Sequence, residues 1–293
     1  MDAPLAGSSE EVRQASQLLN SGEQDQFPRP PRRTVICVWN VKGRVGKTVT
    51  VINIASVLAL NGSRVLVVDL DPQGHASAAL GVPHHAGVPS IYDCLITEAP
   101  ISDIAQSVTV VPNLWCVPAT IDLHEIEFEL RMLTANEWRL QRALDREPDS
   151  YDYVLIDCSP SVGLLTLNAL VASTEVLIPV QCEYTGLEAL QYVANRIQVV
   201  KNYFNAELNV TAVLLTMYDR ASRLADAIEQ DVRDSFGDQV LAAVIPHDLV
   251  LSEAYADGQP LVIYRPGSAP AIRYREAAME IAKRGGHRAD AIE

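Results

Sequence analysis

The sequence has no long hydrophobic run and no paired-cysteine motif, and each absence excludes a class of protein. No apolar stretch is long enough to cross a bilayer, and the N-terminus lacks the charged and then apolar pattern of a signal peptide. The five cysteines contain no C-x-x-C pair, so neither a zinc site nor an iron–sulfur site is indicated. We expect a cytoplasmic protein whose cysteines are buried thiols.

Basic residues are also scarce, with 23 Lys and Arg against 37 Asp and Glu and a formal net charge of −14. Nucleic-acid binders usually present a basic face, so this balance argues against strong DNA binding. No G-x-G-x-x-G follows the first expected strand, which disfavours a dinucleotide-binding enzyme. The six histidines are scattered and do not suggest a metal site.

Apolar, β-branched runs alternate with segments of helical periodicity from residue 34 onward. The expected strands cover 34–39, 64–72, 114–118, 153–157, 175–180, 209–217 and 240–245. The expected helices cover 49–60, 123–133, 137–146, 164–172, 185–203, 223–236, 252–257 and 271–284, with short helices and turns over 87–107. This alternation predicts an α/β fold with a single doubly wound, mostly parallel β-sheet and helices on both faces.

The chain divides into a polar tail with a basic, proline-rich linker (1–33), one domain (34–284) and a short C-terminal tail (285–293). A length of 293 residues at 48% hydrophobic composition suffices for one large core. Within the tail, Ser8 to Leu19 is compatible with either a short capped helix or a loosely ordered segment.

The segment Val41-Lys42-Gly43-Arg44-Val45-Gly46-Lys47-Thr48 lies between an expected strand and an expected helix. In that setting, backbone N–H groups and the positive end of the helix dipole bind phosphate oxygens, and Lys47 neutralises their charge. The Thr48 hydroxyl is a ligand for Mg²⁺. The ordinary pattern G-x-x-x-x-G-K-[ST] nevertheless fails, because position 41 is Val.

Carboxylates end two of the expected strands, at Asp69 and Asp71 and again at Asp157. In an open parallel sheet, these strand ends lie at the edge where ligands bind. The alternative is that they are only solvated charges at the ends of strands.

Several segments together resemble one known family. They are Lys42-Gly43-x-x-Gly46-Lys47-Thr48, Val68-Asp69-Leu70-Asp71-Pro72-Gln73-Gly74, Ile156-Asp157-Cys158-Ser159-Pro160, Pro179-Val180-Gln181-Cys182-Glu183-Tyr184, Leu215-Thr216-Met217-Tyr218-Asp219 and Ile245-Pro246. The family is the ParA/Soj partition ATPases, relatives of MinD in the deviant Walker A P-loop class. Residues 116–123 look most like actinobacterial members.

The resemblance implies an ATP- and Mg²⁺-dependent switch in which two chains meet face to face. Lys42 would reach the partner's phosphates, Asp71 would position the attacking water, Thr48 would ligate Mg²⁺ directly and Asp157 would support it through water. The implied nucleotide-binding residues are Lys42, Gly43, Arg44, Val45, Gly46, Lys47, Thr48, Val49, Met217 and Pro246. The family also implies non-specific DNA binding and a ParB-type partner that stimulates hydrolysis.

The chain departs from the family at working positions. Arg44 replaces a glycine that lies where two loops approach each other, so it either obstructs that approach or adds a phosphate contact. Several arginines expected for DNA contact are absent, for example at His247 and Val250. The remaining candidates for DNA contact are Arg220, Arg223, Arg273 and Arg275, with solvated surface charge as the alternative. We therefore expect weak DNA binding, and association with the nucleoid stays open.

Two alternatives follow. The first is a ParA-like orphan with weak or no nucleotide and DNA binding, which acts through protein partners such as a ParA or ParB homologue. The second is a MinD-like membrane switch, which is disfavoured because the helix expected over 271–284 mixes charges and is not a basic amphipathic anchor.

Overall fold

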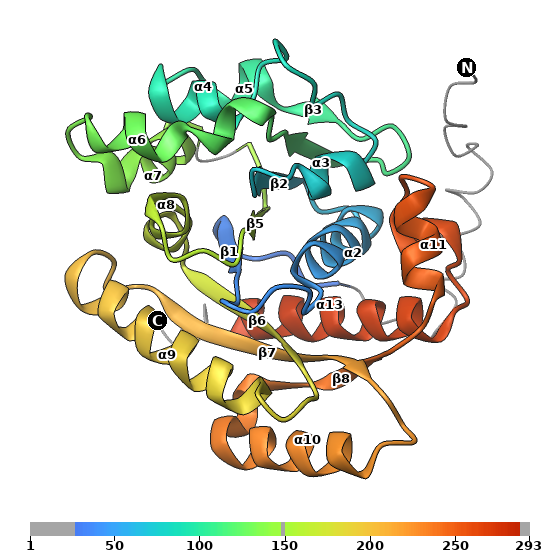
Figure 1. Ribbon diagram of the computed structural model, residues 1–293. Helices are drawn as coiled ribbons and strands as arrows, with labels where there is room; N and C mark the ends of the chain where they lie inside the picture. The colour runs from blue at the N-terminus through green and yellow to red at the C-terminus, as the bar shows by residue number, and fades with distance from the viewer. Residues whose placement is uncertain (1–26, 148–149, 288–293) are drawn as a thin grey trace.

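The structure is a computed structural model and describes residues 27–147 and 150–287. One eight-stranded sheet runs through the molecule (Figure 1), in the order β3-β4-β2-β5-β1-β6-β7-β8, with every neighbouring pair parallel except β3 and β4. The strands are β1 Thr34–Val38, β2 Val65–Leu70, β3 Gln106–Ser107, β4 Leu114–Val117, β5 Tyr153–Cys158, β6 Glu175–Gln181, β7 Asn209–Tyr218 and β8 Val240–Pro246. The predicted fold class is confirmed. The two-residue β3 was not expected, because it is too short to show an alternating pattern.

Helices cover both faces of the sheet, and one apolar cluster lies between the sheet and the helices on each face. One face carries α2 Lys47–Leu60, α3 His75–Ala79, α11 Val250–Ala256, α12 Leu261–Tyr264 and α13 Ala269–His287. The other carries α4 Ile91–Ile96, α5 Ile101–Ile104, α6 Ile126–Arg131, α7 Arg139–Asp145, α8 Leu164–Ala172, α9 Gly186–Tyr203 and α10 Arg223–Phe236. Within the described residues, no helix is both long enough and apolar enough to span a membrane.

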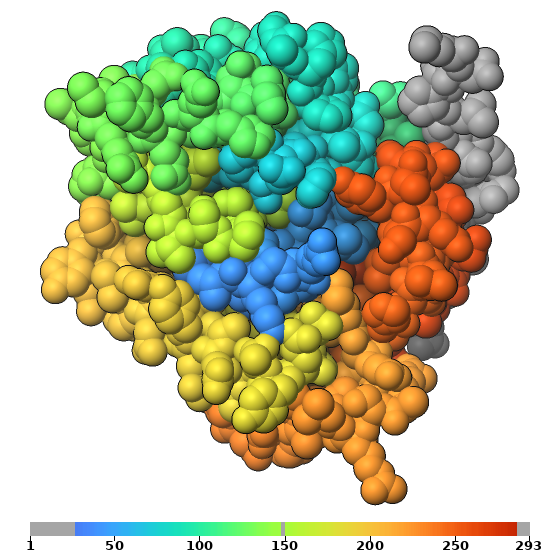
Figure 2. All heavy atoms as spheres, viewed as in Figure 1, coloured from blue at the N-terminus to red at the C-terminus, as the bar shows by residue number. Residues whose placement is uncertain are grey.

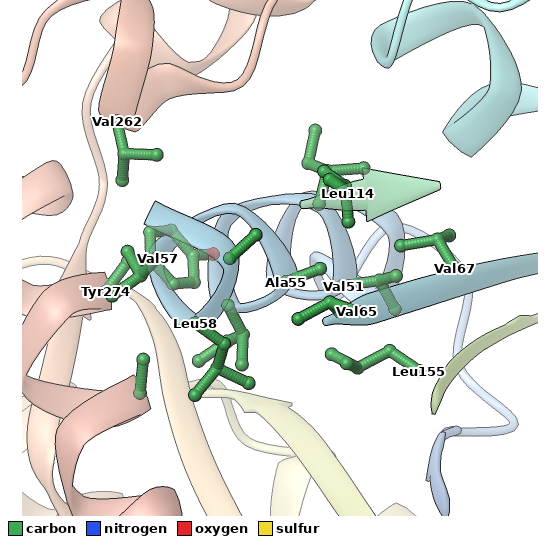
Figure 3. Packing of buried hydrophobic residues seen from close by; sticks show 14 of the residues in the cluster. Val51, Ala55, Val57, Leu58, Val65, Val67, Leu114, Leu155, Val262 and Tyr274 are labelled. Carbon is green, nitrogen blue, oxygen red and sulfur yellow. The ribbon is translucent and has the colours of Figure 1, made fainter. Parts of the chain in front are cut away.

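The helix α2 lies at the centre of the first cluster and is apolar on nearly all sides. Figure 3 shows it between the strand residues Val65, Val67 and Leu155 and the ring of Tyr274 from α13. A helix that is hydrophobic all round is stable only when it is enclosed. The N-terminus of α2, which follows the phosphate-loop segment, is therefore held rigidly at the edge of the sheet.

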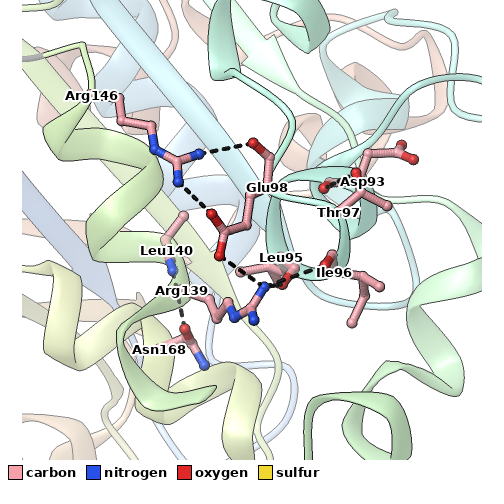
Figure 4. A network of polar contacts seen from close by, with 9 residues as sticks. All are labelled: Asp93, Leu95, Ile96, Thr97, Glu98, Arg139, Leu140, Arg146 and Asn168. Atoms are coloured by element: carbon pink, nitrogen blue, oxygen red, sulfur yellow. Dashed lines mark hydrogen bonds and ion pairs between the residues drawn. The ribbon is translucent and has the colours of Figure 1, made fainter. Parts of the chain in front are cut away.

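A polar network joins α4, α7 and α8 on the other face (Figure 4). Arg146 donates to the backbone oxygen of Glu98 at 2.9 Å and to its carboxylate at 2.5 Å, and Arg139 pairs with the same carboxylate at 3.4 Å. The Arg146 guanidinium lowers the pKa of Glu98. The buried Asn168 accepts from the Leu140 N–H at 3.1 Å, which fixes α8 against α7.

The predicted helix boundaries differ from the structure in the segment between β4 and β5. The helix expected over 123–133 is the turn η1 Ile121–His124 followed by α6, and that expected over 137–146 is the turn η2 Asn136–Trp138 followed by α7. The predicted gap between the two helices is confirmed, since Ala135 has a φ of 50°, a left-handed conformation that a continuous helix does not contain. The helix considered near Ser8 lies outside the described residues.

Candidate nucleotide site

The segment between β1 and α2 forms a loop at the carboxyl edge of the sheet, and two side chains anchor it. Asn40 donates to the Pro179 oxygen at 2.8 Å and accepts from the Lys42 N–H at 3.0 Å. Thr216, at the end of β7, donates to the Val45 oxygen at 2.9 Å. The loop is thus tied to β6 and β7 through Asn40 and Thr216, and the predicted list of site residues included neither of these two residues.

Two residues of the loop have left-handed backbone conformations. Gly46, which precedes α2, has a φ of 84°, and Arg44 has a φ of 62°. Glycine adopts such values without strain, whereas a residue with a side chain does so at a cost. The position of Arg44 is therefore one that favours glycine, and its side chain is exposed.

Lys47 is buried, with 7% of its surface exposed, at the first turn of α2. Its ammonium donates to the Lys42 oxygen at 2.8 Å. Burial lowers the pKa of Lys47, and the nearby Asp157 and Asp71 carboxylates oppose that change. The structure thus brings together the predicted phosphate-binding lysine and the predicted acids of β2 and β5.

Asp157 is fully buried, and neither of its carboxylate oxygens has a hydrogen-bond partner among the described residues. Burial, and then the adjacent Asp69, raise the pKa of Asp157 well above its ordinary range. The Thr48 hydroxyl lies close enough to lower that pKa without reaching hydrogen-bond geometry. Unpaired carboxylate oxygens beside a hydroxyl are a donor set that fits Mg²⁺, which prefers oxygen ligands.

Asp69 and Asp71 differ in their surroundings although they are two residues apart. Asp69 is fully buried and accepts from the N–H and hydroxyl of Ser77 at 2.8 and 2.6 Å. Burial raises the pKa of Asp69 to about 6. Asp71 is half-buried and accepts from the Gln73 N–H at 3.0 Å. Asp69 therefore positions the start of α3, whereas Asp71 is accessible to a ligand.

The Lys42 side chain contacts its own chain. Its ammonium forms an ion pair with Glu183 and a hydrogen bond with Thr185, both in the turn between β6 and α9. Glu183 lies in one of the segments that resemble the ParA/Soj family, and no role was predicted for it. No local pattern indicates this contact, because the two residues are 141 positions apart.

A mostly apolar cavity of about 210 Å³ opens beside the N-terminus of α2. Its lining is Gly46, Val49, Thr216, Met217, Ile245, Leu251, Ser252, Tyr255 and Tyr274. A neighbouring hollow of about 570 Å³ is lined by Met217, Tyr218, Asp219, Arg220, Pro246 and His247. The predicted residues Met217 and Pro246 thus lie beside the loop, and the smaller cavity suits a flat aromatic ring.

The four candidate DNA contacts lie in two places. Arg220, in the turn before α10, and Arg223, the first residue of α10, are exposed, whereas Arg273 and Arg275 lie on α13, on the opposite face of the sheet. Arg273 pairs with Glu276 at 2.6 Å. The Nε of Arg275 is buried and has no hydrogen-bond partner within residues 27–147 and 150–287. Only the first pair is therefore fully exposed.

Comparisons with known proteins agree with this geometry. A family model described as an AAA domain matches residues 33–210. The chain is 44% identical over 251 residues to the sporulation initiation inhibitor protein Soj of Bacillus subtilis, covering 86% of this chain and 99% of that protein. It is 41% identical over 252 residues to the chromosome partitioning protein ParA of Caulobacter vibrioides, covering 85% of this chain and 94% of that protein.

A solved structure from Mycobacterium smegmatis is similar as well. It is described as cobyrinic acid a,c-diamide synthase with a bound ATP analog and magnesium, and it is 33% identical with a TM-score of 0.74. The match covers 86% of this chain and 95% of that one. The fold described above is therefore one that holds an adenine nucleotide and magnesium in a relative.

Proposed function

Because this chain belongs to the AAA domain family and, within it, to the ParA/Soj family of partition ATPases, we propose that it is an ATP-dependent dimerising switch in chromosome or plasmid partition. The observation that carries the proposal is the buried Lys47 between the Asp71 and Asp157 carboxylates at the start of α2. A buried cation at a helix N-terminus binds phosphate, and the two acids beside it have distinct roles in hydrolysis.

Each part of the site has a role in this proposal. The backbone of residues 42–49 holds the phosphates of ATP, and Lys47 neutralises their charge. Thr48 and Asp157 hold Mg²⁺, the latter through water. That ion, when bound, neutralises charge on the phosphate oxygens. Asp71 orients the water that attacks the terminal phosphate. The cavity at Met217 and the hollow at Pro246 receive the base and its sugar.

Dimerisation is supported by apolar side chains that surround the loop. Val162 follows β5, and Tyr184, which is 79% exposed, follows β6. Phe128 on α6 is 75% exposed, and α6 packs on the turn after β5, since an added methyl at Gly163 would overlap the Glu127 carboxylate. Figure 2 shows the loop exposed at the centre of this face, between the segments that follow β5 and β6. Exposed apolar groups of this kind typically mark an interface.

The partners in this proposal are a second copy of the chain and a ParB-type or ParA-type protein. Non-specific DNA binding is weak, because the net charge is −14 and the exposed pair Arg220 and Arg223 supplies few phosphate contacts. The proposed switch does not involve a membrane. Partition places the protein in the cytoplasm, with the chromosome or plasmid as cargo.

The proposal is tested by phosphate release and by the oligomeric state with ATP and Mg²⁺. The wild-type chain should hydrolyse ATP slowly and dimerise, whereas Lys47→Ala should lose both properties. Asp71→Ala should keep ATP binding and lose hydrolysis. A wild-type chain that neither binds ATP nor differs from these variants would show the proposal to be wrong.

DNA binding has a separate test. Arg220→Ala should weaken binding to unrelated DNA sequences equally and reduce the slope of log affinity against log salt by about 1. The same change at Arg273, which is paired with Glu276, should have a smaller effect.

The second candidate is a ParA-like protein that binds nucleotide weakly or not at all and acts through protein partners. The left-handed Arg44 and the Lys42 contact with Glu183 favour it, because the first strains the loop and the second engages a cation that would otherwise meet phosphate. Calorimetric titration of Arg44→Gly with ATP and Mg²⁺ separates the two functions. A clear gain of binding over the wild type supports the impaired loop, and equal or weaker binding supports the switch.

A further inference from the structure

The loop carries two cations outside the buried Lys47, and the structure holds them differently. Lys42 is engaged by the Glu183 carboxylate and the Thr185 hydroxyl. The Arg44 guanidinium is exposed and has no hydrogen bond or ion pair within the described part of the chain. The cation that is free to meet an incoming phosphate is therefore Arg44.

The turn that holds Lys42 is built tightly. The Glu183 N–H donates to the Gln181 oxygen at 2.8 Å, and the Gly186 N–H donates to the Glu183 oxygen at 2.8 Å. A Cβ at Gly186 would lie 2.5 Å from the same Gln181 oxygen, so only glycine fits there. The Glu183 backbone is thus fixed to the end of β6 and presents its carboxylate to Lys42 from a rigid support.

The conformation of Arg44 adds an independent observation. A side chain at a φ of 62° is strained, and glycine would relieve that strain. Strained residues of this kind cluster at ligand sites, where the conformation serves the function. A guanidinium also binds phosphate through two parallel N–H groups, which an ammonium cannot do.

We propose that the turn Glu183 to Thr185 is a latch that withholds Lys42 in the nucleotide-free chain, and that Arg44 makes the first contact with phosphate charge. Lys42 joins only when phosphate oxygens replace the Glu183 carboxylate and the Thr185 hydroxyl around its ammonium. This inference rests on the proposed ATP-dependent function and specifies how that site is regulated. The latch sets the ATP concentration at which the switch engages.

The test is a double-mutant cycle between positions 44 and 183, with ATP-dependent dimerisation and hydrolysis as readouts. Glu183→Gln keeps the shape of the turn and removes its charge, and Arg44→Gln keeps the backbone and removes the cation. Glu188→Gln, an exposed acid one turn further along α9, is the matched control. Thermal unfolding shows that each variant is folded.

Glu183→Gln should lower the ATP concentration for half-maximal dimerisation about fivefold, the size expected for releasing a partly exposed ion pair. Arg44→Gln alone should raise that concentration about tenfold, as for one charge-assisted contact. In the Glu183→Gln background, Arg44→Gln should have a clearly smaller effect, because the freed Lys42 takes its place. Glu188→Gln should change nothing. Equal effects of Arg44→Gln in both backgrounds, or no effect of Glu183→Gln, would overturn the latch.

A second measurement does not depend on ATP. The chain has only four lysines, Lys42, Lys47, Lys201 and Lys283. Acetylation of the nucleotide-free protein with an N-hydroxysuccinimide ester, quantified by mass spectrometry against Lys283, should modify Lys42 several-fold faster in Glu183→Gln with Thr185→Val. An unchanged rate overturns the latch even if ATP binds. A raised rate in a protein that does not bind ATP would support the latch and refute the proposed function.

Discussion

Replacing the buried Asp157 by Asn should stabilise the nucleotide-free protein and remove its response to magnesium and ATP. Neither carboxylate oxygen of Asp157 has a hydrogen-bond partner in the part of the chain that the structure describes, and the residue is fully buried. An unsatisfied buried polar group costs about 1–3 kcal/mol, and an unsatisfied charge costs more. Asn has nearly the same shape and leaves its amide unpaired as well, but it cannot ionise, so we expect the free energy of unfolding at pH 8 to rise by about 1 kcal/mol or more.

The pH dependence gives the sign of the effect. The pKa of Asp157 is raised by burial, so the folded state favours the protonated acid. Its contribution to stability is complete below the ordinary value of 3.8 and is lost as the pH rises toward the raised pKa. The difference between Asp157→Asn and the wild type should therefore be small in acid and grow as the pH rises.

Calorimetric unfolding with and without ATP and Mg²⁺ measures both the stability of the nucleotide-free protein and its response to the ligand. The wild type should gain about 2.7 kcal/mol at a ligand concentration one hundred times its dissociation constant, and Asp157→Asn should gain far less. Asp152→Asn is the matched control at the start of the same strand. Burial works against ionisation of Asp152, but hydrogen bonds from Arg64 prevail and lower its pKa, so its loss should destabilise the protein at pH 8. A less stable Asp157→Asn protein, or one with the full response to ATP, would refute this reasoning.

Three further changes test the backbone and the packing. In urea unfolding, Arg44→Gly should leave the free energy of unfolding unchanged or raise it by up to about 1 kcal/mol, because the relief of left-handed strain is at least as large as the entropy cost of glycine. Ala135→Gly should behave in the same way, because Ala135 is also left-handed. Gly186→Ala should lower the free energy of unfolding by about 1–3 kcal/mol in the same assay, because its Cβ would overlap a backbone oxygen of β6. Gly267→Ala should lower it little, because a Cβ there meets nothing within 4 Å. Equal losses in the two variants would contradict the packing argument. Asn168→Ala should lower the free energy of thermal unfolding by about 1–3 kcal/mol, because it leaves the buried Leu140 N–H without its partner, and an unchanged midpoint would contradict that role.

The fold was predictable because its strands are short apolar runs and its helices are periodic. The residues of β1 and β2 are all buried, so hydrophobicity alone marks them. The failures lie between β4 and β5, where short helices and 3₁₀ turns replace two longer helices. The left-handed Ala135 lies in the gap that was predicted between the two helices, so the break there was expected, whereas the 3₁₀ turns at the start of each were not.

The site was predictable to the extent that its parts end parallel strands. Asp71 and Asp157 follow apolar runs, and the common edge of the sheet brings them to Lys47. The contacts that hold the loop were not predictable. Thr216 donates to Val45 across 171 residues, and nothing in either local sequence indicates it. Such pairs depend on the strand order, which a single sequence does not specify.

Three groups of the site are in unfavourable surroundings in the nucleotide-free fold. Lys47 is an amine removed from water, Asp157 is a buried acid without a hydrogen-bond donor among the described residues, and Arg44 holds a conformation that suits glycine. Each raises the free energy of the nucleotide-free fold. Phosphate relieves Lys47 and a divalent cation relieves Asp157, whereas a second phosphate contact offsets the backbone strain at Arg44 without removing it. A ligand that supplies all three binds the folded chain selectively and stabilises it. The enclosed helix α2 keeps these groups in place without the ligand. The site is therefore preformed, and little conformational entropy is lost when the ligand binds.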